Sequence, residues 1–225
     1  MAKRKKLLIK RNQRCDMPII IDDILQGSPE WRDLKAGIPS GTGFSKIVTL
    51  KGDLVKNWRT YLYKVAAEAI DGPKEQGKLS ADMLRGIEFE DEARKCYELD
   101  ENVDVVCVGF IFADETRRYG VSPDGLVGEN GLIEIKCPTL PIHIKYIDEA
   151  KLPNDYFQQV QGQLMVSGRE WVDFFSYFSD LNTDTDVPNF KLRVYRDEIF
   201  ITKLRAELEI FVEELDMLVE KLRAM

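Results

Sequence analysis

An aliphatic segment that carries two opposite charges constrains this chain more than any other feature. The run Leu132-Ile133-Glu134-Ile135-Lys136 has the aliphatic and β-branched residues that are typical of a buried strand. Successive side chains of a strand point to opposite faces, so Glu134 and Lys136 share one face while Ile133 and Ile135 fill a core on the other. The sequence therefore predicts a core strand that presents a carboxylate and an ammonium group toward a cleft.

An aspartate upstream of this strand is expected to lie near the charged residues of the strand. Asp124 lies between a proline and a glycine, and the later Asn130-Gly131 pair is a hairpin-turn signal. The segment Tyr119–Cys137 is therefore predicted to form a hairpin, which can bring Asp124 near Glu134. The proline and glycine disturb the regular ladder, so spacing alone does not determine which face Asp124 occupies.

Two carboxylates brought together point to a cation. They repel each other, and the pKa of one rises unless a positive charge lies between them. Mg²⁺ prefers oxygen ligands, uses few protein carboxylates and keeps water or phosphate oxygens in its other positions. Lys136 can hold an attacking water and stabilise charge in the transition state, so the pattern indicates metal-assisted phosphodiester hydrolysis. The structural alternative is a solvent-facing strand with an ordinary Glu/Lys alternation.

The overall composition favours a soluble globular domain. Hydrophobic residues make up 44% of the 225 residues and charged residues 32%. No apolar run approaches the ~20 residues of a membrane span, and the start lacks the apolar stretch of a secretory signal. We therefore expect no membrane association and a cytoplasmic location. The four cysteines form no C-x-x-C pair, and His143 is the only histidine, which argues against zinc, iron–sulfur and triad chemistry.

The charge is unevenly distributed along the chain. The net charge is −7, yet residues 1–14 hold seven bases and no acid. We expect residues 1–16 to form a basic, flexible tail and residues 17–225 to form a single domain. Such a tail could contact nucleic acid or serve as a solubilising terminus.

Hydrophobic spacing and turn signals predict an α/β fold with one central mixed, mostly antiparallel sheet flanked by helices. Ser28 and Pro29 have the residue types of a helix N-cap and a first helical position. The predicted helices are Pro29–Ala36, one beginning near Ser45, Lys56–Ala69, Ala81–Leu99, Asp155–Ser167 and an amphipathic C-terminal helix over Glu198–Met225. The predicted strands, besides the hairpin, are Val103–Phe112, Trp171–Phe178 and Phe190–Tyr195.

Four segments, in order and with matching spacing, resemble the lambda exonuclease family of phage recombination nucleases. Each short motif is common by itself, whereas the ordered set is specific, and the resemblance covers roughly residues 25–200. The proline-aspartate pair followed ten residues later by E-I-K is similar to the PD-(D/E)xK nuclease signature. The segments are LRGIEFEDEAR (84–94), GVSPDGLV (120–127), LIEIKCP (132–138) and YFQQVQGQLMV (156–166), preceded by WRDLKAGIPSGTGFSKIV (31–48).

The resemblance implies a restriction-endonuclease-like fold and a 5′→3′ exonuclease that acts on double-stranded DNA ends. Such an enzyme releases 5′-mononucleotides and leaves 3′ single strands for recombination by strand annealing. The implied cofactor is Mg²⁺, with Mn²⁺ as a substitute and one or two ions per site. The implied partners are DNA ends, two further copies in a ring-shaped homotrimer, and a single-strand annealing protein. The implied setting is the cytoplasm of a bacterial host, with a phage or prophage as the source.

The resemblance also assigns roles to individual residues. Asp124 and Glu134 correspond to the main metal ligands, assisted by the carbonyl of Ile135. Lys136 corresponds to the residue that positions and activates the water. Glu90 corresponds to a contact with a second metal or its water shell.

Further residues correspond to substrate contacts. Gln159 matches a residue that positions the nucleophile or the substrate, and Tyr156 lies near it. The family holds the 5′-phosphate with an arginine and a serine, where this chain has Lys35 and Thr42. Lysine keeps the charge but not the bidentate fork of arginine, so the need for a 5′-phosphate is left open. Ser40, in the same glycine-rich loop, could share this task.

Two other classes of function fit the same residues. A restriction-type or repair endonuclease of the same fold would use the same catalytic groups, and closed circular DNA distinguishes it from an end-dependent exonuclease. A DNA-binding assembly protein with a decayed site is disfavoured, because Asp124, Glu134 and Lys136 are all present. A small-molecule phosphatase is disfavoured by the lack of a phosphate-cradling G-x-x-x-x-G-K-[ST] loop.

Overall fold

A five-stranded mixed sheet forms the centre of the computed structural model, which describes residues 17–74, 77, 79–179 and 187–225. The expected basic tail, residues 1–16, lies outside the described residues. In the order β2-β5-β6-β7-β8, only the β6–β7 pair is parallel. The five strands are β2 (Val105–Val106), β5 (Gly125–Val127), β6 (Gly131–Lys136), β7 (Trp171–Ser176) and β8 (Phe190–Tyr195).

A separate antiparallel sheet of three short strands lies beside the central sheet. Its order is β1-β3-β4, and the strands are β1 (Ile19–Ile21), β3 (Phe110–Phe112) and β4 (Gly120–Val121). The expectation of a single sheet was therefore incomplete. The predicted strand over Val103–Phe112 is divided between the two sheets as β2 and β3. Gly109 interrupts it, where a side-chain methyl would lie 2.2 Å from the carbonyl oxygen of Ile24.

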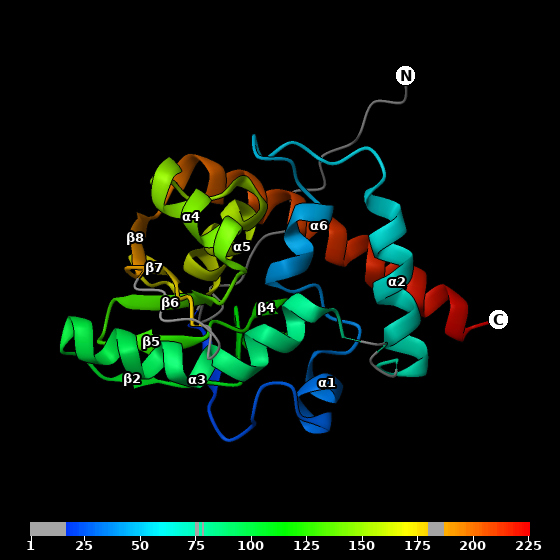
Figure 1. Ribbon diagram of the computed structural model, residues 1–225. Helices are drawn as coiled ribbons and strands as arrows, with labels where there is room; N and C mark the ends of the chain where they lie inside the picture. Colours follow the sequence, from blue (N-terminus) through cyan, green and yellow to red (C-terminus); the bar gives the residue numbers. More distant parts are fainter. Residues whose placement is uncertain (1–16, 75–76, 78, 180–186) are drawn as a thin grey trace.

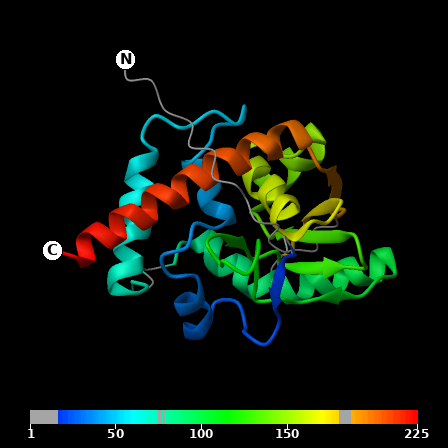
Figure 2. The same cartoon turned by 180° about the vertical axis from the view of Figure 1, so that it is seen from behind.

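Helices cover both faces of the central sheet, as predicted (Figure 1). The α3 helix runs along one face, whereas α4 and α5 lie on the other, and α6 packs on both α5 and α2. Figure 2 shows α6 extending from the sheet layer to the outlying α2 helix. The helices are α1 (Pro29–Lys35), the 3₁₀ helix η1 (Gly41–Lys46), α2 (Trp58–Asp71), α3 (Ala81–Glu101), α4 (Leu140–Glu149), α5 (Asn154–Ser167) and α6 (Glu198–Arg223).

The alternation predicted for β6 places its two faces in different surroundings. Ile133 and Ile135 belong to a core beneath α3, together with Phe89 of that helix. Leu132 belongs to the larger core that contains residues of α2, α5 and α6. Glu134 and Lys136 share the face of Leu132, so α5 lies above them, and Glu134 is buried rather than open to a cleft.

Several local predictions are confirmed and several are wrong. Ser28 caps α1, since its side chain accepts a hydrogen bond from the amide of Trp31 at 3.1 Å. In place of the helix expected near Ser45, the chain forms η1 from Gly41 onward. The α4 helix was not predicted, although Thr139 precedes it and it carries a proline in its first turn.

The turn of the β5–β6 hairpin also differs from the prediction. Val127 pairs with Gly131, so a three-residue loop connects the strands instead of a two-residue Asn-Gly turn. The positive φ of 53° falls on Gly128, whose lack of a Cβ permits it. No helix in the described part of the chain is both long and apolar enough to cross a membrane.

Candidate active site

Glu134 is a buried carboxylate surrounded by donors. Its side chain is 1% exposed, on a central strand with paired neighbours on both sides. Gln159 and Gln163 of α5 each donate from Nε2, at 2.6 Å to Oε1 and 2.6 Å to Oε2 respectively. Lys136 also donates to Oε1. A buried carboxylate requires such compensation, since desolvation penalises its charge.

Lys136 is bonded to the buried Glu134 carboxylate and is itself partly exposed to solvent. Its side chain is 24% exposed and its Nζ lies 5.1 Å from the centroid of the Tyr156 ring, within cation–π range. Burial by itself lowers the pKa of Lys136, but the carboxylates of Glu134 and Asp124 raise it above its ordinary value. Lys136 is therefore a cation at neutral pH, and its ammonium group can face an anionic ligand.

Asp124 completes a carboxylate pair with Glu134, as the hairpin predicted. It directly precedes β5, where its amide donates to the Ile133 carbonyl at 3.2 Å. Its Oδ2 accepts a hydrogen bond from the Ile135 amide at 2.6 Å. Burial, and then the charge of Glu134, raise the pKa of Asp124 well above its ordinary value, with Lys136 opposing. The single ammonium group of Lys136 does not balance two ionised carboxylates. One more positive charge is needed before Asp124 and Glu134 are both stably ionised.

The carbonyl of Ile135 is oriented toward this pair. A strand residue directs its N–H and C=O to the same side, and the Ile135 amide is bonded to Asp124. The Ile135 carbonyl therefore points to the Asp124 side of β6, and it accepts a hydrogen bond from Lys136 Nζ at 3.1 Å. The Ile135 side chain is buried beneath α3.

Glu90, on α3, influences the same site through its charge. Its charge contributes to the raised pKa of Asp124, so the two carboxylates interact electrostatically. The Glu90 side chain is 43% exposed and forms an ion pair with Arg94 at 3.1 Å, one turn along the helix. The structure therefore places Glu90 at the edge of the site, bonded to its own helix.

The oxygen-rich set fits a hard divalent ion better than a transition metal. Within the described residues, no group of three or more His, Cys, Asp or Glu side chains is close enough to hold a metal. Two carboxylates and one backbone carbonyl remain, and Mg²⁺ commonly binds through one or two carboxylates with water and phosphate oxygens. A divalent ion would supply the charge that Asp124 and Glu134 lack.

Two glutamines of α5 contact the buried carboxylate, although the sequence indicated only one of them as a site residue. Gln158, Gln161 and Gln163 are all buried, although glutamines are mostly exposed in proteins. Gln159 and Gln163 are one helical turn apart and face Glu134 together. The i, i+4 spacing of two amides above an acidic strand was the available signal for Gln163.

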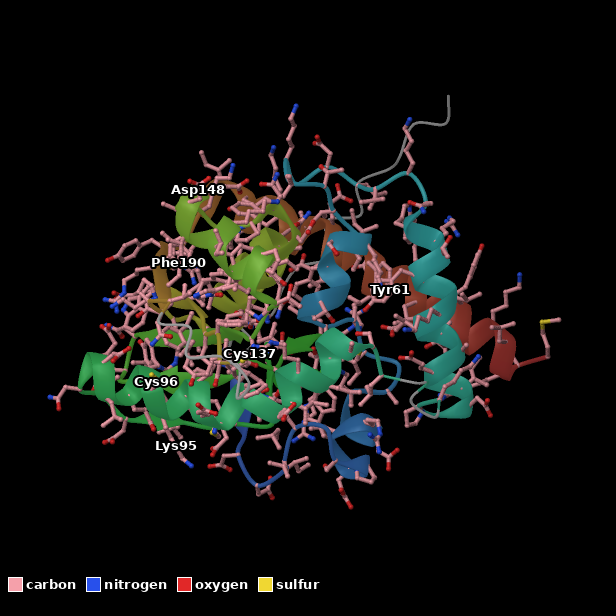
Figure 3. The ribbon with its side chains drawn as sticks, viewed as in Figure 1. Tyr61, Lys95, Cys96, Cys137, Asp148 and Phe190 are labelled. Atoms are coloured by element: carbon pink, nitrogen blue, oxygen red, sulfur yellow. The ribbon has the colours of Figure 1, made fainter. Side chains whose placement is uncertain are left out.

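The glycine-rich loop packs against α5. Ser40 pairs with Gly120 through an isolated bridge and precedes η1, in which Thr42 is exposed. A methyl group placed on Gly41 would lie 3.6 Å from Cγ of Gln159. Gly41, which lies between Ser40 and Thr42, is therefore beside Gln159, the residue that contacts Glu134. On the other side of η1, Gly43 packs against the hydroxyl group of Tyr61, which points from α2 toward η1 (Figure 3).

Lys35 is connected to the site indirectly, because it contacts Trp31. Its Nζ lies 3.7 Å from the centroid of the Trp31 ring, and burial, opposed by Glu68, lowers the pKa of Lys35 to about 8. The Trp31 indole donates to the Gly109 carbonyl at 2.9 Å and to Ser122 Oγ at 3.2 Å. Because Ser122 lies two residues before Asp124, Trp31 connects the Lys35 helix to the carboxylate loop.

His143, Cys96 and Cys137 lie outside this chemistry. His143 is buried and bonded through Nδ1 to Ser176 Oγ at 2.7 Å, so its contacts are with the protein interior. Cys137 follows β6 and is buried in the core beneath α3, with Cys96 further along that helix (Figure 3). Burial raises the pKa of the Cys137 thiol to about 12, so it is protonated and unreactive.

Comparison with known families identifies this arrangement. A family model described as a YqaJ-like viral recombinase domain matches residues 30–170, which include the loop, the carboxylate hairpin and α5. The chain belongs to the YqaJ-like viral recombinase family. The lambda-exonuclease-type resemblance of the sequence is thereby confirmed, and the YqaJ-like chain is a nuclease of the phage recombination type.

Solved structures agree with this family and fold. An alkaline exonuclease (LHK-Exo) from Laribacter hongkongensis is 32% identical, with a TM-score of 0.77 over 88% of this chain and 97% of that one. The same exonuclease was also solved in complex with dAMP. A phage-related exonuclease from Haemophilus somnus 129PT, 15% identical over 82% of this chain and 96% of that one, shares the fold with a TM-score of 0.64. Comparison with curated proteins gave no match.

Proposed function

We propose that this YqaJ-like protein is a Mg²⁺-dependent 5′→3′ exonuclease that degrades one strand of double-stranded DNA from an end. The observation that carries the proposal is the pairing of Asp124 with a buried Glu134 next to Lys136, all on one rigid hairpin. A rigid strand holds reacting groups within a fraction of an ångström, as hydrolysis of a phosphodiester requires. Residues 17–225 constitute a single nuclease domain in this proposal.

Asp124 and Glu134 hold the divalent ion, with the Ile135 carbonyl as a third oxygen ligand. Glu90 contacts a second ion or its water shell when it leaves Arg94. When bound, the ion polarises a phosphoryl oxygen and lowers the pKa of a coordinated water. Mn²⁺, which also accepts oxygen ligands, substitutes for Mg²⁺.

Lys136 and α5 act on the substrate. The Lys136 ammonium, next to Glu134 and partly exposed, orients the attacking water and stabilises negative charge on the phosphate. Gln159, at the partly exposed end of the glutamine pair, positions the nucleophile or the phosphate. Tyr156, whose ring faces Lys136, borders the position of the scissile phosphate.

The 5′ end of the DNA binds beside the glycine-rich loop. Ser40 and Thr42 supply hydroxyl groups next to Gln159, and Lys35 supplies a positive charge on the Trp31 side. The products are 5′-mononucleotides and a 3′ single strand. In this proposal the protein assembles as a ring-shaped homotrimer around DNA in the bacterial cytoplasm and passes the strand to an annealing protein, as the resemblance to the lambda exonuclease family implies.

The direct test uses linear duplex DNA labelled at either the 5′ or the 3′ end. The DNA is incubated with Mg²⁺ beside a closed circular duplex, with EDTA and Lys136→Ala as controls. We expect early release of 5′-labelled mononucleotide, an intact circle, and no release in either control.

The other outcomes distinguish the alternatives. Cleavage of the circle would indicate an endonuclease or repair nuclease with the same residues. Early release of the 3′ label would reverse the polarity. Absence of Mg²⁺-dependent cleavage of both substrates would refute the assignment of Asp124, Glu134 and Lys136 as a nuclease site, and binding of DNA without cleavage would favour an inactive assembly protein.

A further inference from the structure

The two oxygens of Glu134 have different partners. Oε1 accepts from Lys136 and from Gln159, both of which are partly exposed and can turn toward a ligand. Oε2 accepts from Gln163 at 2.6 Å. Gln163 is 1% exposed, so this contact is inside the protein and closed to solvent.

Gln163 is held more firmly than Gln159. It lies one turn further along α5, between helix residues such as Val160 and Leu164 that are completely buried. Gln159 instead faces Gly41 of η1, at the end of α5 nearer the substrate loop. A ligand that enters the site therefore can displace the amide of Gln159 from Glu134, whereas the amide of Gln163 stays in place.

The amide of Gln163 does not serve stability alone. Its Oε1 is buried and has no hydrogen-bond partner among the described residues. An unpaired buried carbonyl destabilises a fold, and an apolar side chain of the same shape avoids that cost. Rotation of the amide would place its oxygen against the Glu134 carboxylate, so only the present orientation provides a donor.

We propose that Gln163 is a positioning residue, which holds Oε2 of Glu134 and thereby leaves Oε1 as the oxygen offered to a divalent ion. This inference rests on the proposed function, since it concerns the same carboxylate. Without the Gln163 donor, Glu134 can rotate, and its second oxygen competes for Lys136. Residues that orient a metal ligand typically contribute 10- to 100-fold to metal affinity or activity.

The test replaces Gln163 with methionine, which has a similar length and volume but no amide. Gln158→Met is the matched control, because Gln158 is also a buried glutamine of α5 with an unpartnered Oε1, bonded to the Val48 carbonyl at 3.3 Å instead of Glu134. Calorimetric titration of the metal-free proteins with Ca²⁺ measures metal affinity without catalysis. Thermal unfolding in EDTA measures stability.

We expect Gln163→Met to lower the Ca²⁺ affinity about 10- to 100-fold and to raise the Mg²⁺ concentration for half-maximal cleavage similarly. Its melting temperature in EDTA should fall below that of the wild type, because the buried Glu134 carboxylate loses a donor, and the Gln158→Met control should bind Ca²⁺ as the wild type does. If Gln163→Met does not fold, Gln163→Asn, whose shorter amide cannot reach Glu134, should show the same loss of affinity.

Failure of this inference differs from failure of the proposed function. Unchanged Ca²⁺ affinity in a folded Gln163 variant, or an equal loss in the Gln158 control, would overturn the positioning role while wild-type cleavage upheld the nuclease. Wild-type protein that binds Ca²⁺ in a Gln163-dependent manner but cleaves no DNA would overturn the nuclease alone. Wild-type protein that binds no divalent ion would overturn both.

Discussion

Replacing Asp124 by asparagine should stabilise the metal-free protein while abolishing its activity. Burial and the neighbouring Glu134 raise the pKa of Asp124, and Lys136 offsets this only in part. Without a metal at pH 8, folding therefore forces two carboxylates into a site with one cation. Asparagine removes the excess charge, and its side-chain oxygen can still accept the hydrogen bond that Ile135 donates at 2.6 Å.

The sign and size of this effect follow from proton linkage. A carboxyl group with a raised folded pKa stabilises the fold fully below its unfolded pKa of about 3.9 and loses that contribution as the pH rises through the folded pKa. The advantage of Asp124→Asn is therefore small near pH 4 and grows as the pH rises toward the folded pKa of Asp124. Removing an unfavourable interaction at a functional site typically raises the free energy of unfolding by about 0.5–2 kcal/mol. At this chain length, that gain corresponds to an increase in melting temperature of roughly 1–8 °C.

Thermal unfolding in EDTA at pH 4, 6 and 8 measures the effect, and added Mg²⁺ should reverse the order by stabilising only the wild type. Asp173→Asn is the control. Asp173 is fully buried and accepts two hydrogen bonds from Arg193 and one from Tyr97, each at 2.8 Å. Its replacement should destabilise the protein by about 2 kcal/mol, because the buried Asp173 would lose charge-assisted hydrogen bonds from a partly exposed arginine. An Asp124→Asn protein that melts below the wild type in EDTA at pH 8 would refute the reasoning.

Three further perturbations test the site. Lys136→Ala should lower kcat about 100-fold or more in single-turnover cleavage while leaving the melting temperature in Mg²⁺ close to that of the wild type. Gly162→Ala should destabilise the protein by about 1–3 kcal/mol in urea unfolding, because the added methyl would lie 2.3 Å from Cδ2 of Phe44 and push η1 away from α5. Lys35→Gln should weaken the preference for 5′-phosphorylated over 5′-hydroxyl ends about tenfold in competition assays, the value of one charge-assisted hydrogen bond. Because burial lowers the pKa of Lys35 to about 8, the wild-type preference should also decline as the pH rises above that value and the lysine loses its proton.

Each of these expectations can be contradicted. A Lys136→Ala enzyme with a wild-type rate would remove Lys136 from the chemistry. Wild-type stability of Gly162→Ala would show that η1 and α5 can separate without cost. An end preference that is unaffected by Lys35→Gln and constant across pH 7–9 would transfer recognition of the 5′-phosphate to Ser40 and Thr42.

Local patterns were predictable where they depend on neighbouring residues. Ser28 and Pro29 indicated the start of α1 because a cap is an interaction within one helical turn. The alternation over β6 correctly separated Ile133 and Ile135 from Glu134 and Lys136 because the pleat imposes a period of two. The division of Val103–Phe112 between two sheets was not predictable, because it depends on the close approach of Gly109 to Ile24, and these two residues are far apart in the sequence.

The sequence by itself determined the chemical content of the site, because Asp124, Glu134 and Lys136 lie within thirteen residues on one hairpin whose geometry is local. The tertiary structure alone decided that Glu134 is buried beneath α5 and that Gln163 holds its second oxygen. It also decided that the charge of Glu90, on the α3 face of the sheet, acts on Asp124. These contacts depend on how whole helices pack on the sheet, and packing is set by the shape of every buried side chain rather than by the spacing of any single motif.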